Sequence, residues 1–205
     1  MTLDQNYFDE VYTDNADPFR LGDNWYEDRK YALTVAALPR ARYRRALEPG
    51  CSIGILTEKL AARCDALVST DIVTSALASA GARVDSEHVR FVEWSLTESW
   101  DVVAQGETFD LIVLSEVGYY LDELDLRAAL DTAITHLEPC GTLLAVHWRH
   151  PVADYPQSGD EVHGIIAATD GLVRIGGYVD EDVILEVFAA STDRPDSVAR
   201  IEGLV

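Results

Sequence analysis

From residue 46 onward, short apolar runs alternate with amphipathic stretches, and this alternation constrains the fold more than any other feature of the chain. The predicted strands end at Glu48 or cover 66–71, 89–92, 109–114 and 142–147. The predicted helices between them cover 55–61, 74–82 and 122–137. Residues 109–114 form a largely apolar run, which is typical of a strand covered on both faces. The order of elements predicts an α/β fold with a doubly wound, mostly parallel sheet.

The pattern changes at both ends of this alternation. After Pro151, a helix is predicted over 160–169, and two strands over 172–179 and 182–189 would form an antiparallel hairpin at one edge of a seven-stranded sheet. Before it, residues 25–38 predict a helix that Pro39 ends. We expect one domain over 1–205, with the helix plus edge hairpin in 160–190 and residues 191–205 unassigned.

The first 24 residues mix acidic and aromatic side chains, and we expect them to form an arm that packs through its aromatic rings. These aromatic residues are Tyr7, Phe8, Tyr12 and Phe19. The first ten residues are acidic and polar, so they do not resemble a signal peptide.

Charge and cysteine usage restrict the partners and the compartment. Lys and Arg total 16 against 36 Asp and Glu, giving a formal net charge of -20. Such a chain is a poor ligand for duplex nucleic acid or an anionic membrane, but suits a cationic or neutral small molecule. Three widely spaced cysteines without a CxxC pair indicate reduced thiols in a cytoplasmic protein, and no apolar run approaches the ~20 residues of a membrane helix.

A glycine loop, Glu48-Pro49-Gly50-Cys51-Ser52-Ile53-Gly54, joins the first predicted strand to its helix. This is the turn where doubly wound folds bind adenine nucleotides. A nicotinamide site would favour G-x-G-x-x-G, but Ser52 and Ile55 stand at the second and third glycine positions. The pattern E-x-G-x-x-x-G favours S-adenosyl-L-methionine, although a plain tight turn would also need glycines.

Asp71 follows the glycine loop at the end of the next predicted strand, 17 residues after Gly54. A carboxylate there can accept hydrogen bonds from both ribose hydroxyls of an adenosine. Alternatively Asp71 caps the next helix, but Thr74 or Ser75 could do that instead.

Three segments resemble the motifs of class I S-adenosylmethionine-dependent methyltransferases: LEPGCSIGILTEKLAARCDALVSTDIV (47–73), FDLIVLSEVGYYL (109–121) and LEPCGTLLAV (137–146). They cover about half the chain. Asp17-Pro18-Phe19-Arg20, Cys51 and the stretch 115–120 are similar to the nodulation protein S family, whose members N-methylate the free amine of a chitooligosaccharide after a deacetylase has exposed it. The resemblance implies a Rossmann-like methyltransferase fold with its cofactor core over 46–148.

The resemblance also implies a set of cofactor-binding residues for S-adenosylmethionine and its product S-adenosylhomocysteine. They are Glu48, Gly50, Cys51, Ser52, Gly54, Asp71, Ile72, Ser95, Leu96 and Ser115, with Tyr26 and Arg29 from the helix before the core. Residues 1–38 would form a lid, with Tyr26 or Arg29 at the methionyl carboxylate. One departure concerns adenine: related enzymes carry an acid near Ser95, so its hydroxyl or the backbone of Leu96 would replace that group, and Trp94 would stack on adenine or simply pack.

The ends of the fourth and fifth strands supply the expected catalytic groups, because ligands in this fold lie outside the carboxyl ends of the strands. We expect Glu116 to hold or deprotonate the acceptor amine and His147 to serve as an alternative base, with Tyr119, Tyr120 and His150 contacting substrate. Glu116 could instead be a solvated acid, and His147 a strand-end histidine bonded to backbone. The spacing His147-x-x-His150 lacks a third ligand nearby, so no metal is expected.

These features together predict an S-adenosylmethionine-dependent methyltransferase acting on an amine of a small molecule or amino sugar. Three alternatives remain open: a small-molecule O-methyltransferase, a nicotinamide-dependent oxidoreductase, and a cofactor-binding regulator without catalysis.

Overall fold

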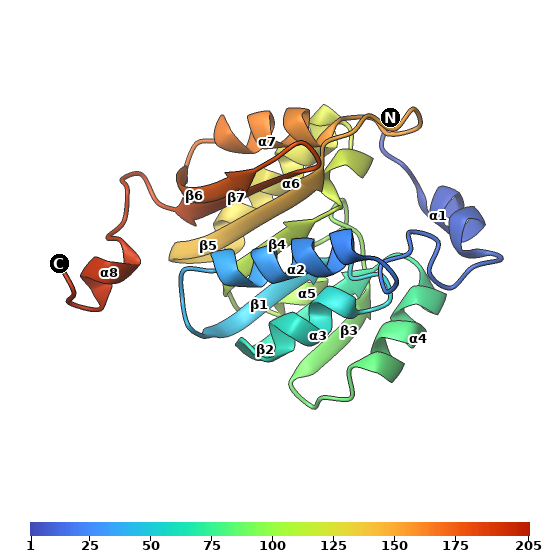
Figure 1. Cartoon of the computed structure of the whole chain (residues 1–205), viewed down its shortest axis with the longest axis horizontal. Coiled ribbons are helices and arrows are strands. Elements are labelled where there is room, and N and C mark those ends of the chain that lie inside the picture. The colour runs from blue at the N-terminus through green and yellow to red at the C-terminus, as the bar shows by residue number, and fades with distance from the viewer.

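A computed structural model describes residues 1–205, and it contains one seven-stranded sheet in the order β3-β2-β1-β4-β5-β7-β6 (Figure 1). The strands are β1 (Tyr43–Pro49), β2 (Cys64–Asp71), β3 (Val89–Glu93), β4 (Phe109–Ser115), β5 (Leu137–Trp148), β6 (Leu172–Val179) and β7 (Val183–Ala190). Strands β1 to β5 pair in parallel, whereas β7 pairs antiparallel with both β5 and β6. The predicted fold class, with its antiparallel edge pair, is therefore confirmed.

Helices cover both faces of this sheet. They are α1 (Gln5–Tyr12), α2 (Trp25–Ala37), α3 (Ile55–Ala61), α4 (Thr74–Arg83), α5 (Asp101–Ala104), α6 (Glu123–His136), α7 (Gly159–Ala167) and α8 (Val198–Ile201), with the short 3-10 helix η1 (Gly118–Tyr120). One core cluster packs α5, α6 and α7 against one face of the sheet, and a second packs α2, α3 and α4 against the other, whereas α1 lies beyond the ends of the strands (Figure 1). All seven residues of β4 are buried, which explains its apolar sequence.

Side-chain caps begin several of these helices and fix where they start. The Asn24 side chain accepts a hydrogen bond from the backbone N–H of Glu27 at 3.0 Å, so α2 begins at Trp25. Ser158 and Glu161 form a reciprocal capping box at the start of α7. At the other end of α2, Leu38 is already extended, as expected for the residue before Pro39.

The structure differs from the sequence-based prediction at the start of β5. The turn expected at Glu138-Pro139-Cys140-Gly141 lies inside the strand, which begins at Leu137 directly after α6. The pairing of Phe109 with Leu137 is followed by that of Leu111 with Thr142, so the intervening residues bulge from the ladder. Cys140 adopts a left-handed backbone there, with φ of 60°.

The ends of the chain also contain helices that the sequence did not predict. Asp4 caps α1 by accepting from Tyr7, within the expected arm of residues 1–24. The C-terminal α8 lies away from the sheet and its helices (Figure 1). No helix combines the length and the apolar character needed to cross a membrane.

Candidate active site

A pocket of about 430 Å³ lies beyond the carboxyl ends of β1, β2 and β4, with the arm on its other side. Its volume falls in the range of about 300–1,000 Å³ that is usual for small-molecule sites. Most of the lining residues are hydrophobic. The polar and charged groups among them gather in two places, around the glycine loop and around Glu116.

The glycine loop brings its backbone close to the pocket. Gly50 has φ of 70°, and a Cβ there would lie 3.2 Å from Cγ2 of Val117. Gly54 has φ of 81°, but its Cβ would meet Ala80 at 2.9 Å, and Gly54 is not part of the pocket lining. Gly54 thus permits close packing of α3 on α4, while Gly50, Cys51 and Ser52 line the pocket.

Asp71 fastens the glycine loop from the end of β2. Its Oδ2 accepts from the Ser52 N–H at 2.8 Å and its Oδ1 from the Val73 N–H at 3.0 Å. Burial raises the pKa of this carboxyl, while these backbone bonds act in the opposite direction. Each carboxylate oxygen can accept two hydrogen bonds, so each can accept a further one from a ligand. Val73 is the N-cap of α4 and has no side-chain cap bond, so Asp71 does not serve as that cap.

Glu48 lies beneath the same loop. Its Oε2 accepts from the hydroxyls of Thr57 at 2.6 Å and Ser69 at 2.7 Å, and burial raises its pKa to about 7. Burial likewise raises the pKa of the Cys51 thiol, so this cysteine is held as a neutral thiol rather than a nucleophile.

Residues after β3 form the next part of the pocket wall, together with Ile72. The Ser95 hydroxyl accepts a hydrogen bond from the Thr97 backbone N–H at 3.3 Å and lies 3.1 Å from the Thr97 hydroxyl. Leu96 is buried. Trp94 also lines the pocket, but it is 1% exposed, donates its indole N–H to the Ser99 carbonyl, and packs edge-to-face on Trp100.

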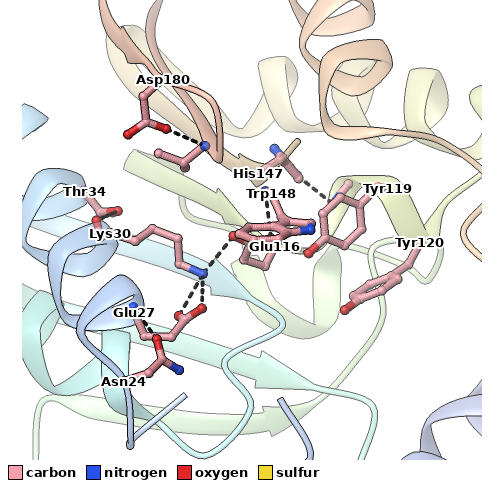
Figure 2. Close-up of polar contacts among 12 residues, drawn as sticks. Asn24, Glu27, Lys30, Thr34, Glu116, Tyr119, Tyr120, His147, Trp148 and Asp180 are labelled. Atoms are coloured by element: carbon pink, nitrogen blue, oxygen red, sulfur yellow. Dashed lines mark hydrogen bonds and ion pairs between the residues drawn. The ribbon is translucent and has the colours of Figure 1, made fainter. Parts of the chain in front are cut away.

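Glu116 is held at the opposite wall by contacts from three elements. Its Oε1 accepts from Lys30 Nζ at 2.8 Å, and its Oε2 accepts from the Trp148 N–H at 3.1 Å and from the Tyr119 hydroxyl. Figure 2 shows Lys30 reaching from α2 and Tyr119 from η1 toward this carboxylate. Glu116 follows Ser115, which also lines the pocket, and has φ of 57°. A non-glycine residue in this conformation is strained, and such strain concentrates at functional sites.

Lys30 is the main site residue that the sequence analysis did not single out. It is 2% exposed and pairs with Glu116 and with Oε2 of Glu27, both at 2.8 Å. Burial lowers its pKa, but the two carboxylates outweigh this and raise it, so Lys30 remains an ammonium. Burial raises the pKa of Glu27, and Lys30 opposes that shift. The sequence signal that could have identified Lys30 is the spacing Glu27-x-x-Lys30, which places both side chains on one face of a helix. Lysine is also rare in this chain, since the other one is Lys59.

Aromatic side chains close the pocket on the same side. Tyr119 and Tyr120 pack edge-to-face with centroids 4.8 Å apart, and burial raises the pKa of both phenols well above the usual value. Tyr26 packs edge-to-face on Trp148 at 4.9 Å, and its buried hydroxyl has no partner in the protein. That hydroxyl belongs to a pocket-lining residue and is free to bind a ligand.

Besides Gly54, three predicted site residues lie outside the pocket lining, His147, His150 and Arg29, and the structure gives each of them other partners. His147 is completely buried, with Nε2 bonded to the Gly118 N–H and Nδ1 to His163, and burial lowers its pKa well below the usual value. It therefore has no free nitrogen to remove a proton from an acceptor. His150 pairs with Asp182 at 2.8 Å and does not line the pocket.

Arg29 likewise points to a partner other than the cofactor. It pairs with Asp180 at 2.9 Å and donates to the Tyr178 hydroxyl, which ties α2 to the β6–β7 hairpin. The guanidinium is thus engaged away from the pocket.

The arm lies over the pocket. It contributes Thr2, Leu3, Phe8, Tyr12, Phe19 and Leu21 to the lining. Two contacts attach it to the two walls: the Leu3 N–H donates to the Tyr120 carbonyl at 2.8 Å, and the Tyr12 and Ser52 hydroxyls are 2.6 Å apart. No group of three or more His, Cys, Asp or Glu side chains is arranged to hold a metal ion.

Comparisons with known proteins point in one direction. The family model described as Nodulation protein S (NodS) matches residues 7–159. Nodulation protein S of Sinorhizobium fredii is 30% identical over 187 residues, covering 86% of this chain and 84% of that protein.

Two solved structures extend this similarity to the fold. N-methyltransferase NodS from Bradyrhizobium japonicum, in complex with S-adenosyl-L-homocysteine, has a TM-score of 0.76 at 27% identity, covering 91% of this chain and 98% of that chain. A putative methyltransferase from Pseudomonas syringae has a TM-score of 0.68 at 40% identity, covering 81% of this chain and 99% of that chain.

Proposed function

Because the chain belongs to the nodulation protein S family and is an S-adenosylmethionine-dependent methyltransferase, we propose that it methylates an amine nitrogen of a small molecule or amino sugar. The observation that carries this proposal is the cluster of Glu116, Lys30, Glu27 and Tyr119 at the pocket wall. An amine acceptor gains positive charge as it is methylated, and this cluster suits that change.

The residues of the glycine-loop side fit S-adenosylmethionine. Asp71 retains acceptor capacity for ribose hydroxyls, and Gly50 lies where a side chain would meet Val117. Ser95 stands where an acid after β3 was expected, so the adenine amino group would be met by Ser95 or by the Leu96 backbone. When bound, this cofactor supplies an electrophilic methyl group on a sulfonium.

Glu116 would act on the acceptor by electrostatics and orientation. Two carboxylates, Glu27 and Glu116, share the single ammonium of Lys30, which leaves one net negative charge at the wall. This charge attracts an acceptor ammonium and stabilises the positive charge that develops on nitrogen during transfer. Lys30 and Tyr119 meanwhile hold both carboxylate oxygens in place.

The acceptor must be a neutral amine when it attacks, because an ammonium has no lone pair. Both carboxylates of this cluster line the pocket, and Glu116 is the more exposed, at 20% of its side chain against 9% for Glu27. We therefore assign proton removal to Glu116, directly or by passing the proton to solvent. Methyl transfer should become faster with rising pH as the acceptor loses that proton.

The test is radiolabel transfer from S-adenosylmethionine across a panel of amines, alcohols and carboxylic acids. We expect amino sugars with a free amine to be methylated in preference to phenols, phosphates and carboxylates. Glu116→Gln should lower kcat by ~10²-fold, the scale of a lost acid–base group, and leave the affinity for S-adenosylhomocysteine within about twofold. The matched control is Glu87→Gln, an exposed glutamate between α4 and β3. Preference for a phenol, or full activity of Glu116→Gln, would favour O-methylation instead.

A further inference from the structure

A row of hydrogen bonds runs from the pocket loop to the outermost strand of the sheet. The Gly118 N–H lies 3.0 Å from His147 Nε2, and His147 Nδ1 lies 3.1 Å from His163 Nε2. His163 Nδ1 lies 2.8 Å from Oε2 of Glu186. The other oxygen of that carboxylate accepts from Arg174 at 2.6 Å. His147, His163 and Glu186 are all buried, and only the Arg174 side chain is largely exposed.

The chemistry of these groups permits one arrangement of protons. A backbone N–H is always a donor, so His147 Nε2 must be bare and its proton must lie on Nδ1. That proton is donated to His163 Nε2, which must then be bare in turn. His163 consequently carries its proton on Nδ1 and donates it to the Glu186 carboxylate, whose charge Arg174 balances. Both histidines are thus neutral and carry their proton on Nδ1.

The inner end of this row lies against the residues that hold Glu116. Gly118 begins η1, the turn that carries Tyr119 to Glu116, and Trp148, next to His147, donates its N–H to the same carboxylate. A Cβ on Gly118 would lie 2.9 Å from His147 Nε2 and 2.7 Å from Val162 Cγ1, so the turn is in direct contact with the imidazole and with α7. Glu116 is strained and needs such support to keep its orientation.

We propose that His147 and His163 are positioning residues for the transfer: through Gly118 they fix η1, and so hold the Tyr119 hydroxyl on Glu116. This inference rests on the proposed role of Glu116 and assigns a function to His163, Glu186 and Arg174, which lie outside the pocket. Without His163, the buried Nδ1–H of His147 has no acceptor, and a ring that turns to find one releases Gly118.

The first test measures the proton positions by long-range ¹H–¹⁵N correlation spectra of the ligand-free protein. Apart from His136, whose Nδ1 faces the Thr132 carbonyl and is expected to carry a proton, two of the five histidines should show a neutral ring protonated on Nδ1. His163→Gln should remove one of these two signals and identify it. A neutral ring protonated on Nε2 at either position would overturn the proposal. This measurement does not depend on the methyl acceptor, so its failure is distinct from a failure of the proposed function, which would appear as no transfer to any amine.

The second test separates positioning from folding by kinetics. His163→Leu should lower kcat by roughly tenfold and leave the S-adenosylhomocysteine affinity within about twofold, because no contact of the row touches the glycine loop. His163→Gln should restore most of kcat, since its carbonyl can accept from His147 and its amide can donate to Glu186. The matched control is His136→Leu, because His136 ends α6 directly before β5 and does not line the pocket.

Thermal unfolding of each variant shows whether it is folded. A folded His163→Leu with unchanged kcat, or a folded His163→Gln as slow as the leucine variant, would overturn the proposal. If His163→Leu does not fold, the kcat of His163→Gln and the measured proton positions still test the positioning role.

Discussion

At the scale of single residues, two pocket residues that are not glycine hold a left-handed backbone. Ser52 has φ of 48° in the glycine loop and Glu116 has φ of 57° at the opposite wall. Such conformations cost about 1–3 kcal/mol each and persist only where neighbours enforce them. Asp71 and Tyr12 bond to Ser52, while Lys30, Tyr119 and Trp148 bond to Glu116. Both sides of the pocket are therefore held in shape before a ligand binds.

The role of Asp71 leads to a prediction on cofactor affinity. Asp71→Ala removes the expected acceptor of the ribose hydroxyls and also releases the Ser52 N–H. Losing a hydrogen bond to a charged group costs about 1–3 kcal/mol, so the Kd for S-adenosylhomocysteine should rise by about 5- to 150-fold. Calorimetry measures this, with Asp170→Ala, an exposed aspartate before β6, as the control. An unchanged Kd would mean that the ribose binds elsewhere.

The raised pKa of Glu48 leads to a prediction on stability. The folded protein holds this carboxyl at a pKa of about 7, compared with 4.5 when it is not buried. A raised folded pKa stabilises the protein at low pH, and that contribution is lost as the pH rises through about 7. The loss amounts to about 3 kcal/mol.

Urea unfolding of the ligand-free protein at about pH 5 and about pH 8 checks this sign. Glu48→Gln keeps an oxygen that can accept from Thr57 and Ser69, so it should become more stable relative to the unmodified protein as the pH rises. Glu58→Gln, an exposed change on α3, should show no such trend. A difference that stays constant with pH would refute the assignment.

At the scale of elements, the core strands and helices could be predicted because each carries a local signal. The apolar run of β4 reflects its burial on both faces, and Pro39 marks the end of α2. α1 was missed because its cap, Asp4, is one acid among many in the arm. The start of β5 was missed because a strand that absorbs a bulge at Pro139 has the sequence of a turn.

The arm leads to a prediction at this scale. Phe19 and Leu21 line the pocket on either side of Arg20, which is exposed. If residues 1–24 close over the cofactor, S-adenosylhomocysteine should slow tryptic cleavage after Arg20 several-fold, because a bound cofactor holds the arm against the sheet.

The same digest contains its own control. Arg200 lies in α8, away from the sheet, so cleavage after it should proceed at the same rate with and without ligand (Figure 1). Mass spectrometry resolves the two products. Equal protection at both arginines, or at neither, would contradict closure of the arm over the cofactor.

At the scale of the whole molecule, many pocket-lining residues could be predicted from the place of their segment in the fold, whereas contacts between distant segments could not. The glycine loop and Asp71 were found because their spacing in the sequence fixes their spacing in the fold. The pairing of Lys30 with Glu116 was not predicted, because 86 residues separate the two and the sequence around each gives no sign of the other. The role expected for His147 failed for the same reason, because His147 lies on β5 and its partner His163 on α7.

The net charge of -20 leads to a prediction on the acceptor. A field of that sign concentrates cationic ligands, and salt screens it, with a Debye length near 10 Å at about 0.1 M. The KM for a cationic amine should therefore rise several-fold between about 0.02 M and about 0.3 M NaCl. The affinity for S-adenosylhomocysteine, whose charges cancel, serves as the control and should change little. A KM that is constant or falls with salt would argue against a cationic acceptor.

The attachment of α2 to the β6–β7 hairpin has a consequence for how the protein is synthesised. Arg29 bonds to Tyr178 and Asp180, about three quarters of the chain later, and His163 bonds to Glu186. A ribosome that has completed the glycine loop, Asp71 and Glu116 has not yet translated these partners. Each new molecule thus acquires the residues that fit S-adenosylmethionine well before those that fix α2 and η1. The acceptor side of the site is complete only when the last strand has emerged.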